Sequence, residues 1–305
     1  MEDKIEKNRV RIDRDLCSGC GLCASVCPTG TIYLTEGKAT VSEEESMLCG
    51  HCEAVCPEGA IRVTAIDEEM SRYRTFTANK KWLPHGKYDT SALVQLMASR
   101  RSCRNFRKEP VGRDILEDLV KIGITAPSGT NCQYWTFTIL PTRKAVVSLA
   151  EQIARFFEKV NATAEKTVLR RFLKLIGKGE LDTYYHGYYR KVKEALEEWR
   201  SSGKDRLFHG ATAAIIAGSG PGASCPAEDA LLATQNILLA AHSMGLGSCL
   251  IGYAVAAMKN DPSIRRAIGI PSQEKVYAVI ALGYPAEVYQ RTAGRKRVTA
   301  RYFEG

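Results

Sequence analysis

The chain has 305 residues, of which 45% are hydrophobic and 25% charged, and its formal net charge is +9. This composition is typical of a folded globular protein, and the length suggests about two domains. No apolar run reaches the ~18 residues that a membrane-spanning helix needs. The charged segment 1–11 has no apolar region of the kind that signal peptides contain. We therefore expect a cytoplasmic protein without membrane segments.

The positive charge raises the possibility of a nucleic-acid partner. Lys and Arg are, however, spread through 151–206 and 290–301, and no nucleic-acid motif lies among them. A surface that attracts an acidic electron carrier or the phosphates of a cofactor explains the charge equally well, so we expect no nucleic-acid partner.

The first ordered elements belong to a small module at residues 9–66. Its edge strands are expected at 10–12 and 61–63, with a hairpin formed by 33–34 and 39–41 around the turn residues 36–38. So short a segment buries little apolar surface, and bound metal is expected to supply much of its folding free energy.

Seven of the eleven cysteines lie in this module. The first run, from Cys17 to Pro28, has the spacing C-x2-C-x2-C-x3-C-P, which is the bacterial ferredoxin pattern. The run returns at 46–57, with Ser46 in place of its first cysteine. A zinc site is the alternative, but zinc takes four ligands, and two such runs fit that arrangement poorly. The spacing therefore predicts iron–sulfur clusters.

In the ferredoxin pattern, the fourth cysteine of each run binds the cluster of the other run. The first cluster is then expected to use Cys17, Cys20, Cys23 and Cys56, and the second Cys27, Cys49, Cys52 and Ser46. Serine oxygen is a harder ligand than thiolate and binds iron less favourably. The second cluster can therefore be [4Fe–4S] with Ser46, water, Glu44 or Glu45 on the fourth iron; it can be [3Fe–4S]; or it can be absent. We expect two clusters.

The domain boundaries follow from the pattern of elements. We expect a cluster domain at 1–70, a connector at 71–90, and an α+β domain at 91–305. In the α+β domain, hydrophobic periodicity predicts helices at 91–99, 113–124 and 227–243, helical structure over most of 143–206 with a break at 177–179, and strands at 134–140, 211–217 and 275–282. Gly245 is placed to end the long helix. Too few βαβ units are visible for a fully parallel sheet.

Three further motifs carry chemistry. The run Arg100-Arg101-Ser102-Cys103-Arg104 offers guanidinium groups suited to phosphate oxygens, although such a run on its own is typical of a solvated face. The run 126–135 contains small and amide side chains that can approach a flat polar ring. The run 245–249 follows the long helix, and Arg295-Lys296-Arg297 lies near the end of the chain.

This ordered set resembles the nitroreductase family of FMN-dependent α+β flavoproteins over about residues 91–301. The whole chain resembles the subgroup with a two-cluster ferredoxin domain in front. The resemblance implies a homodimer with FMN at the interface. It also implies FMN contacts from Arg100, Arg101, Ser102, Arg104, Gly247, Arg295 and Arg297, from Pro127, Ser128, Gly129 and Asn131 of the second subunit, and, on a looser match, from Glu228.

The chain departs from the family by a helical insertion at about 151–205. Tyr184, Tyr185, Tyr188 and Tyr189 form a double stripe there, which indicates either packing or a lid over the flavin. His186 and His209 are possible proton donors, and the catalytic residues stay unassigned. Four cysteines without metal spacing are expected to be small buried side chains: Cys103, Cys132, Cys225 and Cys249. The run 218–223 fits G-x-G-x-x-A, but no acid follows at the required place, so it indicates a strand-to-helix turn.

The resemblance implies an oxidoreductase of an anaerobe that passes single electrons from iron–sulfur clusters to FMN. Its acceptor would be a small planar molecule such as a nitroaromatic, a quinone, an activated alkene or a halophenol. The expected donor is an external low-potential carrier such as ferredoxin rather than NAD(P)H. The alternative is a non-catalytic redox sensor or electron-transfer subunit that docks on a partner enzyme, with its FMN pocket blocked by the tyrosine-rich insertion.

Overall fold

The computed structural model describes residues 10–42 and 46–305. The chain divides into two compact units. Unit 1 contains the described residues up to Ala78 together with the short segments Pro127–Gln133 and Ala223–Cys225, and unit 2 contains the rest. The sequence did not predict that two later segments join the first unit. Among the described residues, no helix combines the length and the apolar character needed to cross a membrane.

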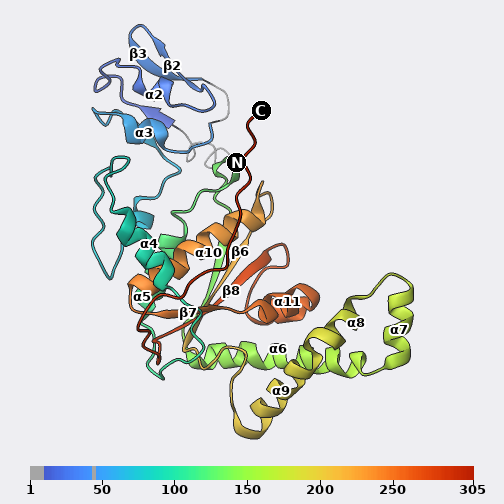
Figure 1. Ribbon diagram of the computed structural model, residues 1–305. Coiled ribbons are helices and arrows are strands. Elements are labelled where there is room, and N and C mark those ends of the chain that lie inside the picture. The colour runs from blue at the N-terminus through green and yellow to red at the C-terminus, as the bar shows by residue number, and fades with distance from the viewer. Residues whose placement is uncertain (1–9, 43–45) are drawn as a thin grey trace. The chain divides into compact units, whose positions relative to one another are not determined.

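Unit 1 is built from two small antiparallel pairs (Figure 1). Strand β1 (Val10–Ile12) pairs with β4 (Ile61–Val63), and β2 (Ile32–Thr35) forms a hairpin with β3 (Lys38–Val41). The predicted edge strands and hairpin are thus confirmed. Two short helices, α2 (Leu22–Ser25) and α3 (His51–Val55), each place one cysteine in the small core.

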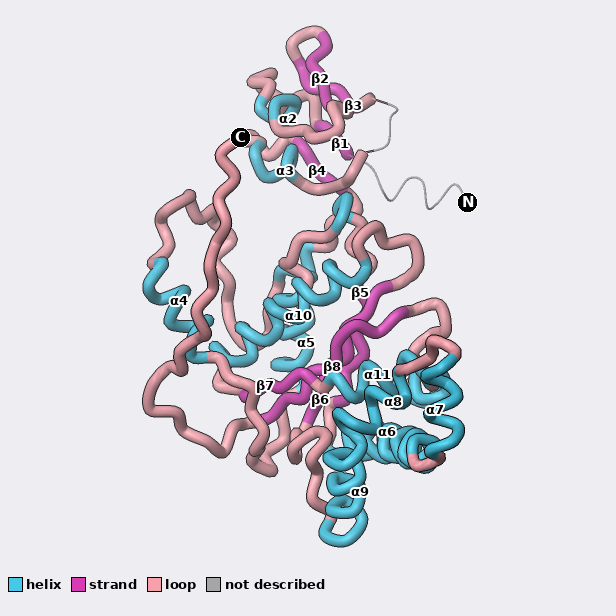
Figure 2. The backbone as a smooth tube through the Cα atoms, turned by 45° about the vertical axis from the view of Figure 1, so that its right-hand side comes forward, coloured by secondary structure: helices cyan, strands magenta, loops and turns pink. Residues whose placement is uncertain are grey.

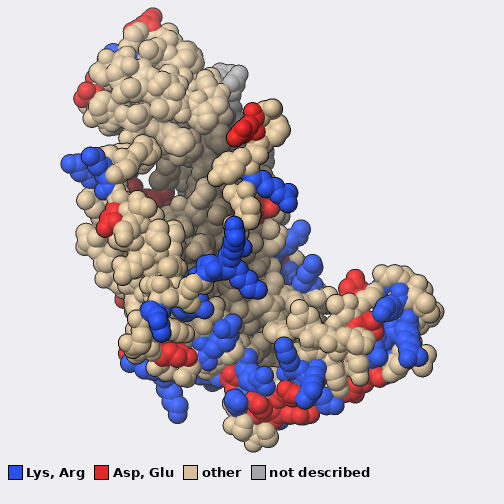
Figure 3. Space-filling model, viewed as in Figure 1, with Lys and Arg blue, Asp and Glu red and all other residues tan. Residues whose placement is uncertain are grey.

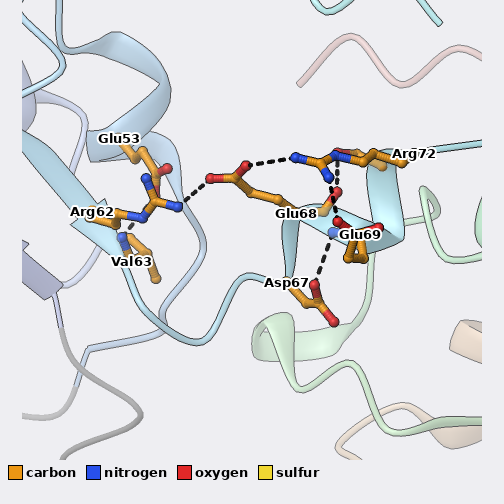
Figure 4. A network of polar contacts seen from close by, with 8 residues as sticks. Glu53, Arg62, Val63, Asp67, Glu68, Glu69 and Arg72 are labelled. Carbon is orange, nitrogen blue, oxygen red and sulfur yellow. Dashed lines mark hydrogen bonds and ion pairs between the residues drawn. The ribbon is translucent and has the colours of Figure 1, made fainter. Parts of the chain in front are cut away.

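A polar network holds α3 to β4 and to the short 3-10 helix η1 (Glu68–Ser71), as Figure 4 shows. The Glu53 side chain accepts the backbone N–H of Val63 at 2.7 Å. Arg62 pairs with Glu68, which also lies 3.8 Å from Arg72. The exposed ion pairs contribute little stability, whereas the bond to Val63 fixes the helix that carries Cys52 against the sheet.

Unit 2 contains a four-stranded antiparallel sheet with the order β5-β6-β8-β7. Strands β5 (Trp135–Leu140), β6 (Ala213–Ser219) and β8 (Lys275–Gly283) lie close to their predicted positions. Strand β7 (Gly247–Leu250) was not predicted. It is only four residues long and begins with glycine, so its sequence carries almost no strand signal; its pairing with β8 forms it.

Helices cover both faces of this sheet (Figure 2). Successive residues of β6 point to opposite faces: Ile215 packs with helices α5 (Arg113–Gly123) and α10 (Pro226–Ser243), and Ile216 packs with α6 (Arg143–Ala164) and α11 (Gly252–Asn260). A further short helix, α12 (Pro262–Ala267), lies beside α6. Helices α11 and α12 were not predicted. As expected, α10 ends just before Gly245, whose φ is 79°.

The insertion continues α6 into α7 (Thr167–Leu175), α8 (Glu180–Tyr184), a π-helical turn (Tyr185–Tyr189) and α9 (Arg190–Ser202). The predicted break is confirmed at Gly177, with φ of 80°. Buried Arg170 donates to Asp182 at 3.1 Å and stacks 3.7 Å from the ring centre of Tyr185. On the face drawn in Figure 3, many Lys and Arg side chains gather over these helices, with Asp and Glu between them. Ion pairs such as Lys193 with Glu165 at 3.2 Å offset part of that charge.

Candidate functional site

Two separate cavities of unit 1 collect the predicted metal ligands. Cys17, Cys20, Cys23 and Cys56 line the first. Cys27, Cys49, Cys52 and Ser46 line the second. Each set takes one cysteine from the other run, which is the exchange that the ferredoxin spacing predicts.

Each cavity of unit 1 brings four predicted ligands together around one space. Within the described residues, no three His, Cys, Asp or Glu side chains come close enough together to hold one metal ion. In a [4Fe–4S] cluster each thiolate binds a different iron, so its ligands stand further apart than those of a single zinc ion.

Hydrogen bonds aimed at the sulfurs favour the thiolate forms that iron requires. The backbone N–H of Ala39 donates to Cys17 Sγ at 3.5 Å, and that bond is the main cause of the lowered pKa of Cys17. Burial raises the pKa of Cys27, but the hydroxyl groups of Thr31 and Thr29 outweigh it and bring the pKa to about 6. Burial raises the pKa of Cys23. The donor set thus fits thiolate-bound clusters.

Two residues of the second cavity, Ser46 and His51, have no cysteine-run counterpart of the same type in the first cavity. Ser46 Oγ accepts the backbone N–H of Leu48 at 3.2 Å, which orients the serine from its own loop. His51 Nδ1 lies 3.4 Å from Cys49 Sγ. The sequence analysis did not single out His51; the signal was that the apolar Leu22 occupies the matching place of the first run. Glu44 and Glu45, the carboxylates considered as ligands, lie outside the described residues.

In unit 2, Arg100 and Arg101 line a cavity of about 500 Å³ together with Gly247 and Ser248. The segment after Arg101 pairs with β7, since Cys103 donates its N–H to Ser248 O at 2.9 Å. A Cβ at Gly247 would stand 2.8 Å from Cys103 Sγ, so only glycine allows this approach. The Ser248 hydroxyl is buried and has no hydrogen-bond partner among the described residues. Two guanidinium groups and an unpartnered hydroxyl fit a phosphate group.

A second and larger cavity of unit 2, about 900 Å³, lies beside the same segment. Arg104 lines it, so the structure separates this arginine from Arg100 and Arg101. Insertion residues Tyr184 and Tyr188 form part of its wall. His209 also lines this cavity.

Comparison with known proteins agrees with this geometry. A model of the nitroreductase family matches residues 97–284, and a model of the 4Fe-4S binding domain matches residues 10–33. The chain belongs to the nitroreductase family. It is 28% identical over 213 residues to an iodotyrosine deiodinase of Thermotoga neapolitana, covering 69% of this chain and 97% of that protein.

Other relatives span similar parts of this chain. A Thermus thermophilus protein named NADH dehydrogenase is 26% identical over 191 residues, which cover 62% of this chain and 84% of the relative. A nitroreductase structure from Bacteroides fragilis, with bound FMN, is 23% identical and covers 69% of this chain and 98% of its own, with a TM-score of 0.49. The expected α+β fold and the identity as a nitroreductase-family oxidoreductase behind an iron–sulfur domain are confirmed.

Several of the predicted FMN contacts lie outside the two arginine-lined cavities. Ser102 is half-buried and bridges to Ser248 instead. Three others are exposed: Glu228 in the first turn of α10, and Arg295 and Arg297 in the irregular C-terminal segment. Their contacts with FMN stay predictions.

The four cysteines without metal spacing differ in burial. Burial is confirmed for Cys103 and Cys249, whereas Cys132 is half-buried and the expectation is wrong for Cys225, which is exposed. Cys225 lies in the segment Ala223–Cys225 of unit 1. There it stands close to Gly129, where an added Cβ would lie 3.0 Å from Cys225 Sγ.

The segment Pro127–Gln133 contains the remaining predicted flavin contacts, Pro127, Ser128, Gly129 and Asn131, and it belongs to unit 1. The Asn131 amide donates to Met47 O at 3.1 Å and to Leu48 O at 3.2 Å. These carbonyls lie between Ser46 and Cys49, two predicted ligands of the second cluster. Asn131 has φ of 55°, a left-handed conformation that Asn tolerates better than most residues. Asn131 therefore braces the loop that carries these ligands.

Replacing Asn131 by Ala should loosen this loop, because two hydrogen bonds are lost and a left-handed residue becomes strained. We expect iron of the second cluster to be lost to a chelator several-fold faster, in line with a loss of about 1–2 kcal/mol. Asn131→Gly separates the two causes, since glycine tolerates this φ. Wild-type iron loss in Asn131→Gly would show that the amide does not brace the loop.

Replacing Ser46 by Cys should strengthen the second cluster, because thiolate is a better iron ligand than a hydroxyl oxygen. We expect slower iron loss to a chelator and an iron content near ~8 per chain, the value for two complete four-iron clusters. Ser25→Cys is the control, since Ser25 is exposed on α2 and lines neither cavity. Unchanged iron content and loss rate in Ser46→Cys would remove Ser46 from the ligand set.

Proposed function

We propose that this nitroreductase-family protein is an FMN-dependent oxidoreductase that takes up single electrons through two iron–sulfur clusters and reduces a small planar acceptor, such as a nitroaromatic, a quinone or an activated alkene. The observation that carries the proposal is the convergence of two four-ligand sets on two cavities. These cavities belong to a chain whose second unit is a nitroreductase domain. When bound, the clusters supply one-electron transfer, and FMN supplies the conversion between one-electron donors and two-electron acceptors.

One cavity of unit 2 is proposed to bind the phosphate of FMN. Arg100 and Arg101, with the unpartnered hydroxyl of Ser248, would hold the phosphate. The larger cavity, which Arg104 lines, has aromatic walls and is assigned to the acceptor.

A homodimer is part of the proposal. Helix α4 (Thr90–Ser99) buries none of its residues within the chain, and its apolar side chains Leu93, Val94 and Met97 are all exposed. An apolar helix face of this kind is typical of a surface that a partner covers. A second copy would cover it, and the flavin would then lie between the subunits with Ser128 and Asn131 contributed across the interface.

The open cavity favours an enzyme over a redox sensor. The sensor alternative expects the tyrosine-rich insertion to block the site, whereas Tyr184 and Tyr188 line about 900 Å³ of space. The proposed donor is an acidic low-potential carrier such as ferredoxin, which the excess of positive charge would attract.

The composition of protein purified under nitrogen tests this proposal. We expect about 7–8 iron atoms per chain, the content of two clusters, together with one FMN. Reduced ferredoxin should then support steady reduction of a nitroaromatic acceptor. Fewer than about 4 irons per chain after reconstitution would contradict the two-cluster proposal, and a full cofactor content without turnover of any acceptor would favour the sensor.

A further inference from the structure

We propose that the 900 Å³ cavity of unit 2 binds the acceptor and prefers a planar aromatic ring that carries an anionic group such as a carboxylate. This inference rests on the proposed function and names its substrate class. It is carried by the walls of the cavity, which are aromatic where the insertion meets α6 and α11 and cationic where Arg104 and Arg206 lie.

The aromatic wall is a connected set of rings. Phe157 of α6 stacks on Tyr184 with ring centres 6.2 Å apart and meets Tyr253 edge to face at 5.6 Å. Tyr188 stacks on Tyr184 at 6.5 Å and meets Tyr253 edge to face at 6.3 Å. The Tyr184 hydroxyl donates to Asn161 Oδ1 at 2.7 Å, which fixes its ring. Tyr188 and Tyr253 remain 52% and 39% exposed, so their ring surfaces are available to stack on a planar ligand.

The charged groups that line the cavity are Arg104, Arg206 and Glu180, with His209 the titratable imidazole. The two arginines outnumber the one carboxylate. Arg206 lies 3.4 Å from Glu198 through Nη1, which is a single long contact and leaves the other guanidinium donors for a ligand. Guanidinium is the group best matched to a carboxylate, because its paired donors bind both oxygens.

The loop that carries His209 is fixed by hydrogen bonds to the side chain of Asp205. Asp205, whose side chain is only 3% exposed, accepts the N–H groups of Phe208 at 2.7 Å and Gly210 at 3.2 Å and pairs with Arg143 at 2.7 Å. This clamp keeps His209 at φ of 57°, a left-handed conformation that is uncommon for residues other than glycine.

The protonation state of His209 also suits the proposal. Burial lowers the pKa of His209; the negative charge of Asp205 opposes this, and the positive charges of Arg104 and Arg206 add to it, so that the pKa lies below its usual value. The imidazole is therefore neutral near pH 7 and offers one N–H donor without repelling the arginines. Arg104, Arg206 and His209 thus supply the cavity with hydrogen-bond donors in addition to its aromatic wall.

Two matched probes test the preference. The holoenzyme, oxidised and without an electron donor, is titrated calorimetrically with 4-nitrobenzoate and with 4-nitrobenzamide, which share ring and nitro group but differ in charge. We expect the carboxylate to bind at least about tenfold more tightly, the size of one charge-assisted hydrogen bond. Arg206→Gln should abolish the difference and leave binding of the amide unchanged. Arg206→Lys should retain part of it.

Arg200→Gln is the matched control, because this exposed arginine lies on α9, pairs with Glu158 and does not line the cavity. Tyr188→Ala should weaken both probes equally, since it removes stacking surface and no charge. Equal affinity of the two probes in the wild type, or an undiminished preference in Arg206→Gln with normal amide binding, overturns the inference. If Arg206→Gln binds neither probe, Arg206→Lys is the deciding variant. Because lysine keeps the charge, an Arg206→Lys protein that binds the amide normally but has lost the preference for the carboxylate also overturns the inference.

The inference and the proposed function can fail separately. Reduction of 4-nitrobenzamide with reduced ferredoxin, without any preference for the carboxylate, would sink the inference alone. Tight and selective binding of 4-nitrobenzoate without reduction of either probe would sink the proposed function and leave the anion site standing.

Discussion

Replacing Cys56 by Ala is expected to remove the first cluster and leave the second. Cys56 belongs to the second cysteine run, but it lines the same cavity as Cys17, Cys20 and Cys23. A cluster that loses one of four thiolates is bound far less tightly, because the free iron position must be filled by a weaker ligand. We expect iron to fall by about half, from ~7–8 to ~4 per chain. Iron analysis and electron paramagnetic resonance of the reduced protein measure this.

The reciprocal change makes the test sharp. Cys27→Ala should remove the second cluster and spare the first, although Cys27 lies in the first run. Cys225→Ala is the control, because this exposed cysteine lines neither cavity. If Cys56→Ala instead abolished the signal of the second cluster and kept the first, the exchange of ligands between the runs would be wrong.

Replacing Arg100 by Gln is expected to release FMN. Arg100 lines the cavity that holds the unpartnered Ser248 hydroxyl, and Gln keeps a polar side chain but removes the charge that a phosphate needs. Loss of a charged hydrogen bond costs about 1.5–3 kcal/mol, which corresponds to ~10–100-fold weaker binding. Ultrafiltration of the purified protein, followed by flavin fluorescence of the filtrate, measures the dissociation.

Arg113→Gln is the control for this change. Arg113 is exposed at the start of α5 and lines neither arginine cavity. Both variants lose the same charge, so a general electrostatic effect would weaken FMN equally in the two. Full flavin occupancy in Arg100→Gln would remove Arg100 from the phosphate site, and equal release from both variants would argue against a specific contact.

The grouping of the cysteines around two cavities could be anticipated from the sequence because its information is local. Cysteine spacing fixes which thiols sit in one loop, and the ferredoxin pattern supplies the exchange between loops. The buried strands β6 and β8 and the end of α10 at Gly245 were also readable, since apolar runs and a left-handed glycine are local signals.

The parts that the sequence did not reveal depend on long-range contacts. Strand β7 exists through its pairing with β8, and the hydrogen bonds of Asn131 reach across more than eighty residues to Met47 and Leu48. The separation of Arg104 from Arg100 also follows from packing, because this segment pairs with β7 and its arginines line two different cavities. None of these contacts leaves a pattern in the neighbouring residues.

Transfer of electrons from reduced ferredoxin to a nitroaromatic acceptor tests the central proposal most directly. Turnover is measured under nitrogen in the wild type and in a Cys27→Ala, Cys56→Ala double variant with full FMN content, with a small chemical reductant as the second donor. We expect ferredoxin-driven turnover to fall to background in the double variant, while the chemical reductant supports similar rates in both proteins. Equal ferredoxin-driven rates in the two proteins would contradict a path through the cysteine-lined cavities.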